Sequence, residues 1–218
     1  MRKKLSILIS VLIVIALGVG IYFAVPNIFG SVIVPLPDEY KGLVEKYAKL
    51  NGLDPCLVAA VINGESRWNA GASSHVGAQG LMQVMPATKR AVEKKFGLPS
   101  GPATDPESNI RVGTRLLRYN FDSYGSLRNV LVAYNAGGSR VVRPDNQLPK
   151  ETQFYIVKIT RYYELYKAVY PTFCAATTSA NPKAAPEPDL PDFVVPAPIE
   201  SPDLLDPNNF WKAFLPES

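Results

Sequence analysis

The chain has 218 residues and a formal net charge of +4, and its hydrophobic residues, 47% of the total, are unevenly distributed. This length accommodates one ordinary domain with appendages and excludes two full domains. No basic stripe with interleaved aromatic residues occurs, which argues against nucleic acid as a partner. The net charge is +3 for residues 1–36, +6 for 37–172 and −5 for 173–218. The central segment therefore suits an anionic polymer, although an ordinary solvated surface explains it equally well.

The N-terminal segment, residues 1–36, is predicted to contain a membrane anchor. Three basic residues precede an uncharged run over residues 5–24, which is long enough to cross the roughly 30 Å hydrocarbon core as a helix. Because the run exceeds the apolar region of an ordinary signal peptide and no clear cleavage site follows, we expect an uncleaved anchor, with a signal peptide as the alternative. The basic residues predict a single-pass protein with its N-terminus in the cytoplasm and residues 37–172 in the periplasm or otherwise outside the membrane.

Residues 37–172 are predicted to form a single, mainly α-helical domain. Apolar residues at helical spacing, N-capping residues and glycine or asparagine stops define its helices. The predicted helices cover residues 38–50, 55 to about 69, 86–96, 105–124, 126–134 and 151–170. The charged residues of helix 86–96, among them Lys89 and Glu93, are interpreted as its solvated face. No convincing period-two strand pattern appears.

The C-terminal segment changes character after Tyr170. Residues 171–218 hold ten of the 20 prolines and carry an acidic excess, so they are predicted to be disordered or extended, with the tail proper at 173–218. Residues 209–215 form an apolar, aromatic island. This island is either a docking segment for a partner or an unselected piece of tail.

The chain has two cysteines, Cys56 near the start of the central domain and Cys174 near its end. In an oxidising compartment they could form a disulfide that joins the first and last parts of the domain. The alternative is a small helix residue at Cys56 and an unpaired tail residue at Cys174. A metal site is not supported, because His75 is the only histidine and no Cys-x-x-Cys pair exists.

One acidic residue, Glu65, continues the apolar face of a predicted helix. The other members of this face recur at three- and four-residue spacing and are Val58, Val61, Ile62 and Trp68. A carboxylate on a buried face loses hydration, and this loss raises its pKa toward the protonated form. Glu65 is therefore a candidate general acid, and the alternative is a core acid neutralised by a partner.

A series of short motifs follows Glu65 along the chain. They are Glu65-Ser66, Ser74, Gly80-Leu81-Met82-Gln83, Met85-Pro86, Ala133-Tyr134-Asn135-Ala136-Gly137 and Glu151-Thr152 with Tyr155. Together and in this order they resemble the signature of the soluble-type lytic transglycosylase (SLT) domain. The resemblance covers roughly residues 37–170 and implies a lysozyme-like fold.

The resemblance implies that Glu65 cleaves peptidoglycan. As acid it would protonate the bond between N-acetylmuramic acid and N-acetylglucosamine, and as base it would then activate the muramoyl C6 hydroxyl to give a 1,6-anhydro end. No metal or organic cofactor is implied. Candidates for a second carboxylate, Asp105, Glu107 and Glu151, are remote in sequence, so the N-acetyl group of the substrate is expected to assist.

The resemblance also assigns residues to the glycan groove. Ser74 and Gln83 match positions that hydrogen-bond the sugars or their N-acetyl groups, and Met85 matches a position that lines the groove. Gln83 could instead satisfy buried backbone groups.

The later motifs extend this assignment. Tyr134 resembles a tyrosine whose hydroxyl lies near the acid and the reacting sugar, although it could simply be a core aromatic. Asn135 is expected to shape that loop, and Glu151 and Tyr155 are expected to be groove residues. His75 matches no motif and is interpreted as a surface loop residue.

Two other functions remain open at this point. A lysozyme-type muramidase would use Glu65 with an activated water and leave reducing ends. A non-catalytic protein could retain the groove for wall binding or assembly. The short domain, anchor and tail are similar to specialised transglycosylases of secretion or conjugation machines, and a general wall-remodelling enzyme fits as well.

Overall fold

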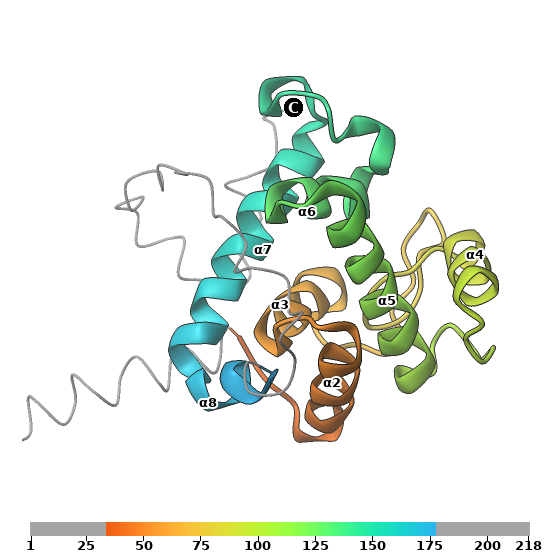
Figure 1. Ribbon diagram of the computed structural model, residues 1–218, viewed down its shortest axis with the longest axis vertical. Coiled ribbons are helices and arrows are strands. Elements are labelled where there is room, and N and C mark those ends of the chain that lie inside the picture. Colours follow the sequence, from red (N-terminus) through yellow and green to blue (C-terminus); the bar gives the residue numbers. More distant parts are fainter. Residues whose placement is uncertain (1–33, 178–218) are drawn as a thin grey trace, which may run out of the picture.

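The computed structural model describes residues 34–177, which form a helical domain (Figure 1). Its helices are α2 (Asp38–Asn51), α3 (Pro55–Ser66), α4 (Pro86–Phe96), α5 (Pro106–Tyr124), α6 (Leu127–Ala136), α7 (Lys150–Val169) and α8 (Pro171–Cys174). Short 3-10 turns lie at Gly138–Arg140, Asp145–Gln147 and Ala175–Thr177. Within the described residues, β pairing is limited to isolated bridges of Gln79 with Ser73 and Val84. The prediction of a single, mainly α-helical domain is confirmed.

The helix boundaries follow local capping chemistry. The carboxylate of Asp54 accepts a hydrogen bond from the backbone N–H of Cys56 at 2.7 Å, and that of Asp105 accepts one from Ser108 at 2.8 Å. Such caps satisfy N–H groups that the first helical turn leaves without partners. Helix α2 stops at Gly52, whose φ of 59° is left-handed and therefore suits glycine.

Helix α3 is the centre of the hydrophobic core. Every residue from Pro55 to Asn63 is buried, whereas a surface helix would keep one polar face. The helix packs against α2, α7 and α8 (Figure 1). Glu65 belongs to its last turn, so the acid lies where the central helix emerges from the core.

Helix α3 ends at Ser66, several residues before the predicted stop near Asn69. Arg67 and Trp68 both have positive φ, 52° and 66°, which is uncommon for residues with side chains. Trp68 is nevertheless buried, and its indole N–H is satisfied by the hydroxyl of Tyr166 at 3.0 Å. The tryptophan therefore joins the core from a turn, and the helix does not have to extend to reach it.

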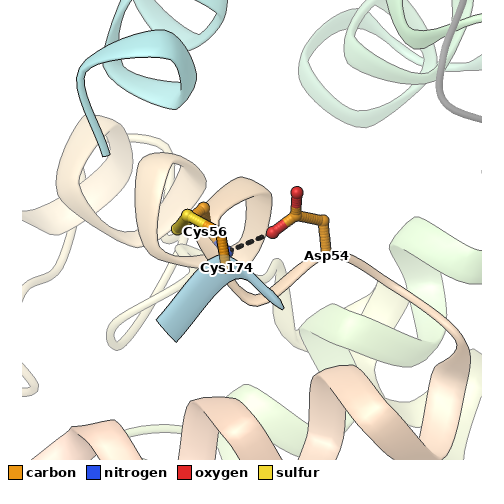
Figure 2. Close-up of side chains that lie close together, drawn as sticks. All are labelled: Asp54, Cys56 and Cys174. Carbon is orange, nitrogen blue, oxygen red and sulfur yellow. Dashed lines mark hydrogen bonds between the residues drawn. A yellow bond between two sulfur atoms is a disulfide. The ribbon is translucent and has the colours of Figure 1, made fainter. Parts of the chain in front are cut away.

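The disulfide that the sequence left open is present, between Cys56 in α3 and Cys174 in α8 (Figure 2). The two Cα atoms are 5.1 Å apart. Asp54 lies close to both sulfurs. The sulfurs are bonded to each other, and the carboxylate of Asp54 caps α3 and accepts a hydrogen bond from Tyr163 at 2.6 Å. This cluster is therefore structural in character.

The folded region is longer at both ends than the predicted domain of residues 37–172. The expectation of an extended chain from Pro171 onward is wrong for residues 171–177, which are helical and bury Phe173 in the core. Disulfide formation and burial of this aromatic ring explain the difference. At the other end, Val34 is fully buried, and the carbonyl of Pro35 accepts a hydrogen bond from Tyr166 at 2.5 Å.

The solvated face predicted for helix 86–96 is also partly wrong. Lys89 and Glu93 are only 6% and 7% exposed. They form an ion pair one helical turn apart, and the hydroxyl of Ser100 donates to the same carboxylate at 3.1 Å. Mutual neutralisation allows both charges to be buried.

Among residues 34–177, no helix combines the length and the apolar character that crossing a membrane requires. The predicted anchor at residues 5–24, the tail beyond residue 177 and its apolar island at 209–215 lie outside the described residues.

Candidate active site

A cavity of about 580 Å³ lies beside the C-terminal end of α3. Its walls come from that helix end, from the loop between α3 and α4, from the end of α6 and from residues 151–162 of α7. The lining residues are Gly64, Glu65, Ser74, His75, Val76, Ala78, Gln83, Met85, Tyr134, Asn135, Glu151, Phe154, Tyr155, Val157, Lys158, Arg161 and Tyr162. The cavity thus brings together every residue that the sequence assigned to catalysis or substrate binding.

Glu65 is held in this cavity by a tyrosine from α7. The hydroxyl of Tyr155 donates to a carboxylate oxygen of Glu65 at 2.7 Å, across 90 positions of sequence. Tyr155 itself is 4% exposed, so its ring is fixed by the core, and burial is the main reason that its pKa lies well above the usual value. The phenol therefore stays protonated and acts as a hydrogen-bond donor to the acid.

The pKa of Glu65 is raised from 4.5 to about 7. Burial is the largest cause; the nearby charge of Glu151 adds to it, whereas the hydrogen bond from Tyr155 and the charge of Lys158 oppose it. At pH 7 a carboxyl with the ordinary pKa would be protonated in about 0.3% of molecules, and one with a pKa near 7 in about half. Glu65 is consequently able both to give and to take a proton near neutral pH.

The hydroxyl of Tyr134 lies near the acid but bonds to the backbone. It donates to the backbone carbonyl of Met82 at 2.9 Å and so joins α6 to the loop between α3 and α4, residues 67–85, which we call the motif loop. Burial and the charge of Glu65 both keep the pKa of Tyr134 well above its usual value. Tyr134 therefore lies near the acid, but Tyr155 is the residue whose hydroxyl bonds to it.

The motif loop between α3 and α4 is fixed by a buried asparagine. The side chain of Asn109 accepts a hydrogen bond from the N–H of Met82 at 2.7 Å and donates to the carbonyls of Gln79 and Ala103. Gly80 has a φ of 78°, and a Cβ there would lie 2.5 Å from the carbonyl oxygen of Ala103. Glycine is required at this point by the backbone and by the close approach of Asn109 in α5 and of the segment that precedes this helix.

Gln83 uses its amide group mainly to hold this loop. Its side-chain nitrogen donates to the carbonyls of Gly80 at 2.8 Å and Ala72 at 3.1 Å, and its own φ is 46°. The alternative interpretation of Gln83, as a residue that satisfies backbone groups, is therefore correct for its amide nitrogen. The side chain also lines the cavity.

The remaining predicted groove residues have different degrees of exposure. Ser74 is half-buried, and its hydroxyl accepts a hydrogen bond from the N–H of Ala78 at 3.0 Å. Met85 is 39% exposed at the rim, and Glu151 is exposed. Asn135 is half-buried at the C-terminal end of α6.

Two of the three other candidate carboxylates, Asp105 and Glu107, are used elsewhere. Asp105 caps α5, and Glu107 accepts hydrogen bonds from Lys46 and Tyr47, each at 2.7 Å. Neither lines the cavity. Among the residues that line it, the carboxylic acids are Glu65 and the exposed Glu151.

Sequence reasoning missed the cationic side of the cavity. Lys158 and Arg161 line it together with the half-exposed Phe154 and Val157, all from α7. A signal was present: Glu151, Tyr155 and Lys158 recur at four- and three-residue spacing and so share a helix face. His75 also lines the cavity from the motif loop, although no role was assigned to it.

The mainly helical architecture, with a poorly hydrated glutamate at the edge of an open cavity, is that of the lysozyme-like class of domains. The family model described as Transglycosylase SLT domain matches residues 42–156, which is more than half of the chain. The chain therefore belongs to the SLT-domain transglycosylase family.

Known relatives include soluble and membrane-bound proteins. A soluble lytic murein transglycosylase of Escherichia coli K12 is 32% identical over 163 residues, which cover 65% of this chain and 25% of that protein. A membrane-bound lytic murein transglycosylase C of Sodalis glossinidius is 39% identical over 118 residues, 48% of this chain and 33% of that protein. The chain thus spans a third or less of the length of these relatives.

A solved structure with the same fold is that of an inactive mutant of lytic transglycosylase Slt from Pseudomonas aeruginosa, in which a glutamate is replaced by glutamine. The TM-score is 0.58 at 27% sequence identity, and the match covers 63% of this chain and 25% of that one.

Proposed function

We propose that this protein is a peptidoglycan lytic transglycosylase that uses Glu65 as its single acid and base. The observation that carries the proposal is the environment of Glu65: a carboxyl with a pKa of about 7, in an open cavity, hydrogen-bonded by Tyr155. Family membership supports the substrate, because the relatives are named as murein transglycosylases. The inactive glutamate-to-glutamine mutant of the Pseudomonas relative supports the role of a glutamate.

In the first step, protonated Glu65 gives its proton to the oxygen that links N-acetylmuramic acid to N-acetylglucosamine. The bond from muramoyl C1 to that oxygen breaks, and N-acetylglucosamine leaves with the proton. The N-acetyl oxygen of the muramoyl residue stabilises the positive charge at C1. Substrate assistance of this kind replaces the second protein carboxylate of ordinary glycosidases.

In the second step, Glu65 is a carboxylate and removes the proton of the muramoyl C6 hydroxyl. The C6 oxygen bonds to C1 and displaces the N-acetyl oxygen, which gives the 1,6-anhydro ring and restores protonated Glu65. No water is consumed. One residue can perform both steps because its pKa lies near the working pH.

The groove residues have supporting roles in this proposal. Ser74 and Gln83 bind sugar hydroxyls or N-acetyl groups, Met85 packs against a sugar ring, and Asn135 shapes the end of α6. Tyr155 positions the acid directly, whereas Tyr134 acts through the carbonyl of Met82.

The test is the chemistry of the products. The full chain is incubated with purified peptidoglycan sacculi, and the released muropeptides are analysed by mass spectrometry. Anhydro-muramoyl ends are expected. Reducing ends, 18 Da heavier because water is added, would identify a muramidase that uses Glu65 with water. No released fragments, with retained binding to sacculi, would identify a wall-binding or assembly protein.

We further propose that residues 5–24 anchor the protein in the membrane and that the catalytic domain acts in the periplasm. The similarity to a membrane-bound transglycosylase C supports this location. The acidic tail beyond residue 177 is proposed to dock onto a secretion or conjugation apparatus. Membrane fractionation of cells expressing the full chain, compared with a variant that lacks residues 5–24, tests the anchor.

A further inference from the structure

Lys158 lies beside the acid although it belongs to none of the motifs. Its ammonium group donates a hydrogen bond of 2.8 Å to the backbone carbonyl of Gly64, the residue directly before Glu65. The same ammonium lies 5.5 Å from the centre of the Tyr155 ring. Carbonyls in the last turn of a helix lack partners within the helix and carry partial negative charge, so they favour a cation.

The backbone of α3 and the helix α7 meet closely at this point. A Cβ on Gly64 would collide with the side chain of Ile159, the residue after Lys158. Glycine therefore permits the contact, and the Lys158 hydrogen bond joins the two helices within one residue of the acid. Tyr155, one turn earlier on α7, contacts Glu65 itself.

We propose that Lys158 is a positioning residue for the acid and base: it fixes the end of α3 so that Glu65 meets Tyr155, and its charge stabilises the carboxylate that Glu65 becomes during the reaction. The inference rests on the proposed function, because it concerns how Glu65 alternates between acid and base. Lys158 needs both features for this role. Its hydrogen bond sets the position of Glu65, and its charge sets the balance between the protonated and carboxylate forms of Glu65.

Several other ionisable groups line the same cavity as Glu65. From α7 these are Glu151, Tyr155 and Arg161, from α6 Tyr134, and from the motif loop His75. Glu151 favours the protonated acid, and Lys158 opposes it. Burial is the main cause that lowers the pKa of Lys158 itself, while the charge of Glu65 opposes that decrease.

The experiment compares three lysine variants of the full chain: Lys158→Met, Lys158→Arg and, as a matched control, Lys167→Met. Lys167 lies on the same helix but pairs with Glu164 at 3.6 Å and does not line the cavity. The initial rate of anhydro-muropeptide release from a low concentration of sacculi is measured between about pH 5 and pH 9, where the descending limb at high pH follows the loss of the Glu65 proton.

Lys158→Met is expected to lower the rate about ten- to hundredfold through misplacement of the acid. It is also expected to shift the high-pH limb to higher pH by about half to one pH unit, because a cation that favours the carboxylate form of Glu65 has been removed. Lys158→Arg should restore most of the rate and the position of the limb. Lys167→Met should behave as the unaltered protein.

Thermal unfolding of each variant shows whether it is folded. If Lys158→Met does not fold, Lys158→Gln replaces it, because glutamine keeps a hydrogen-bond donor but carries no charge. The high-pH limb should again shift to higher pH. An unaltered rate and limb would overturn the inference. So would a lower rate with an unmoved limb that arginine does not rescue.

Glu65→Gln, measured in parallel, separates the proposed role of Glu65 from that of Lys158. If that variant keeps full activity, the proposed function of Glu65 fails. If it is inactive while Lys158→Met matches the unaltered protein, only the role of Lys158 fails.

Discussion

Helices α3 and α4 each carry a glutamate in poorly hydrated surroundings. Compared with an ordinary carboxyl, however, Glu65 has a raised pKa and Glu93 a lowered one. Burial alone would raise the pKa of Glu93, but hydrogen bonds from Lys89 and Ser100 outweigh it, and the pKa is lowered. At Glu65 burial prevails, and the pKa rises to about 7.

The donor that touches the carboxylate explains the difference. At Glu93 it is the ammonium of Lys89 on the same helix, one turn earlier. At Glu65 it is the neutral phenol of Tyr155, while the ammonium of Lys158 donates to the carbonyl of Gly64. Burial therefore does not by itself produce a general acid. At Glu65 the donor against the carboxyl is neutral, and the cation bonds to the neighbouring backbone carbonyl.

Replacing each glutamate by glutamine gives the largest contrast. Glu65→Gln should lower anhydro-muropeptide release at least about 10³-fold, because one residue performs both proton transfers. Glu93→Gln should leave the rate of the folded protein nearly unchanged and mainly lower its thermal stability. Equal loss of activity in the two folded variants would contradict the distinction.

The same contrast should appear in stability against pH. Between pH 4.5 and about 7, folded Glu65 holds a proton that the unfolded chain has released, so the free energy of unfolding falls as pH rises through this window. The fall due to Glu65 is up to about 3 kcal/mol. Glu65→Gln should remove it, so urea unfolding of this variant and of the unaltered protein should diverge toward pH 8. Parallel stability curves would mean that the pKa of Glu65 is ordinary.

Removing the cation of Lys89 from α4 should raise the pKa of Glu93, as burial raises that of Glu65. Lys89→Met leaves a poorly hydrated carboxylate with the hydroxyl of Ser100 as its remaining donor. The free energy of unfolding at pH 7 should fall by about 2 kcal/mol, and part of this loss should be regained at pH 5, where Glu93 is protonated. The double variant Lys89→Met with Glu93→Gln is the control, and it should lose this pH dependence.

The smallest expected effect concerns the neutral donor. Tyr155→Phe removes the hydrogen bond that favours the carboxylate form of Glu65, so the pKa of Glu65 should rise and the high-pH limb of the activity profile should move upward by about half a unit to one unit. The rate should fall about tenfold through looser positioning. Tyr134→Phe should leave the limb in place, because that hydroxyl bonds to the carbonyl of Met82. A shift in the second variant alone would reverse the roles of the two tyrosines.

Much of the fold was predictable because its determinants are local. Two helix starts are marked by an aspartate followed directly by proline, at Asp54-Pro55 and at Asp105-Pro106. The position of Glu65 on an apolar helix face was likewise evident from residue spacing. These features depend on neighbours in sequence, which helix periodicity reports directly.

The remaining features depend on contacts between distant segments. Tyr155 bonds to Glu65 across 90 positions, and Lys158 reaches Gly64 across 94. The burial of Lys89 and Glu93 depends on what covers α4, which the charged sequence of that helix does not reveal. Trp68, which follows the early stop of α3 at Ser66, bonds to Tyr166 across 98 positions. Spacing within one helix contains no information on any of these partners.

The disulfide also determines which helices would carry a mechanical force applied to the C-terminal segment. The chain leaves the described domain at Thr177, three residues after Cys174, and Cys174 is bonded to the first turn of the central helix. A force applied to the C-terminal segment would therefore be transmitted to the first turn of α3 through the disulfide, and it would not unfold α7 from its C-terminal end. The helix that carries Tyr155 is shielded from traction, so a partner could hold the protein by its tail without distorting the residues around Glu65.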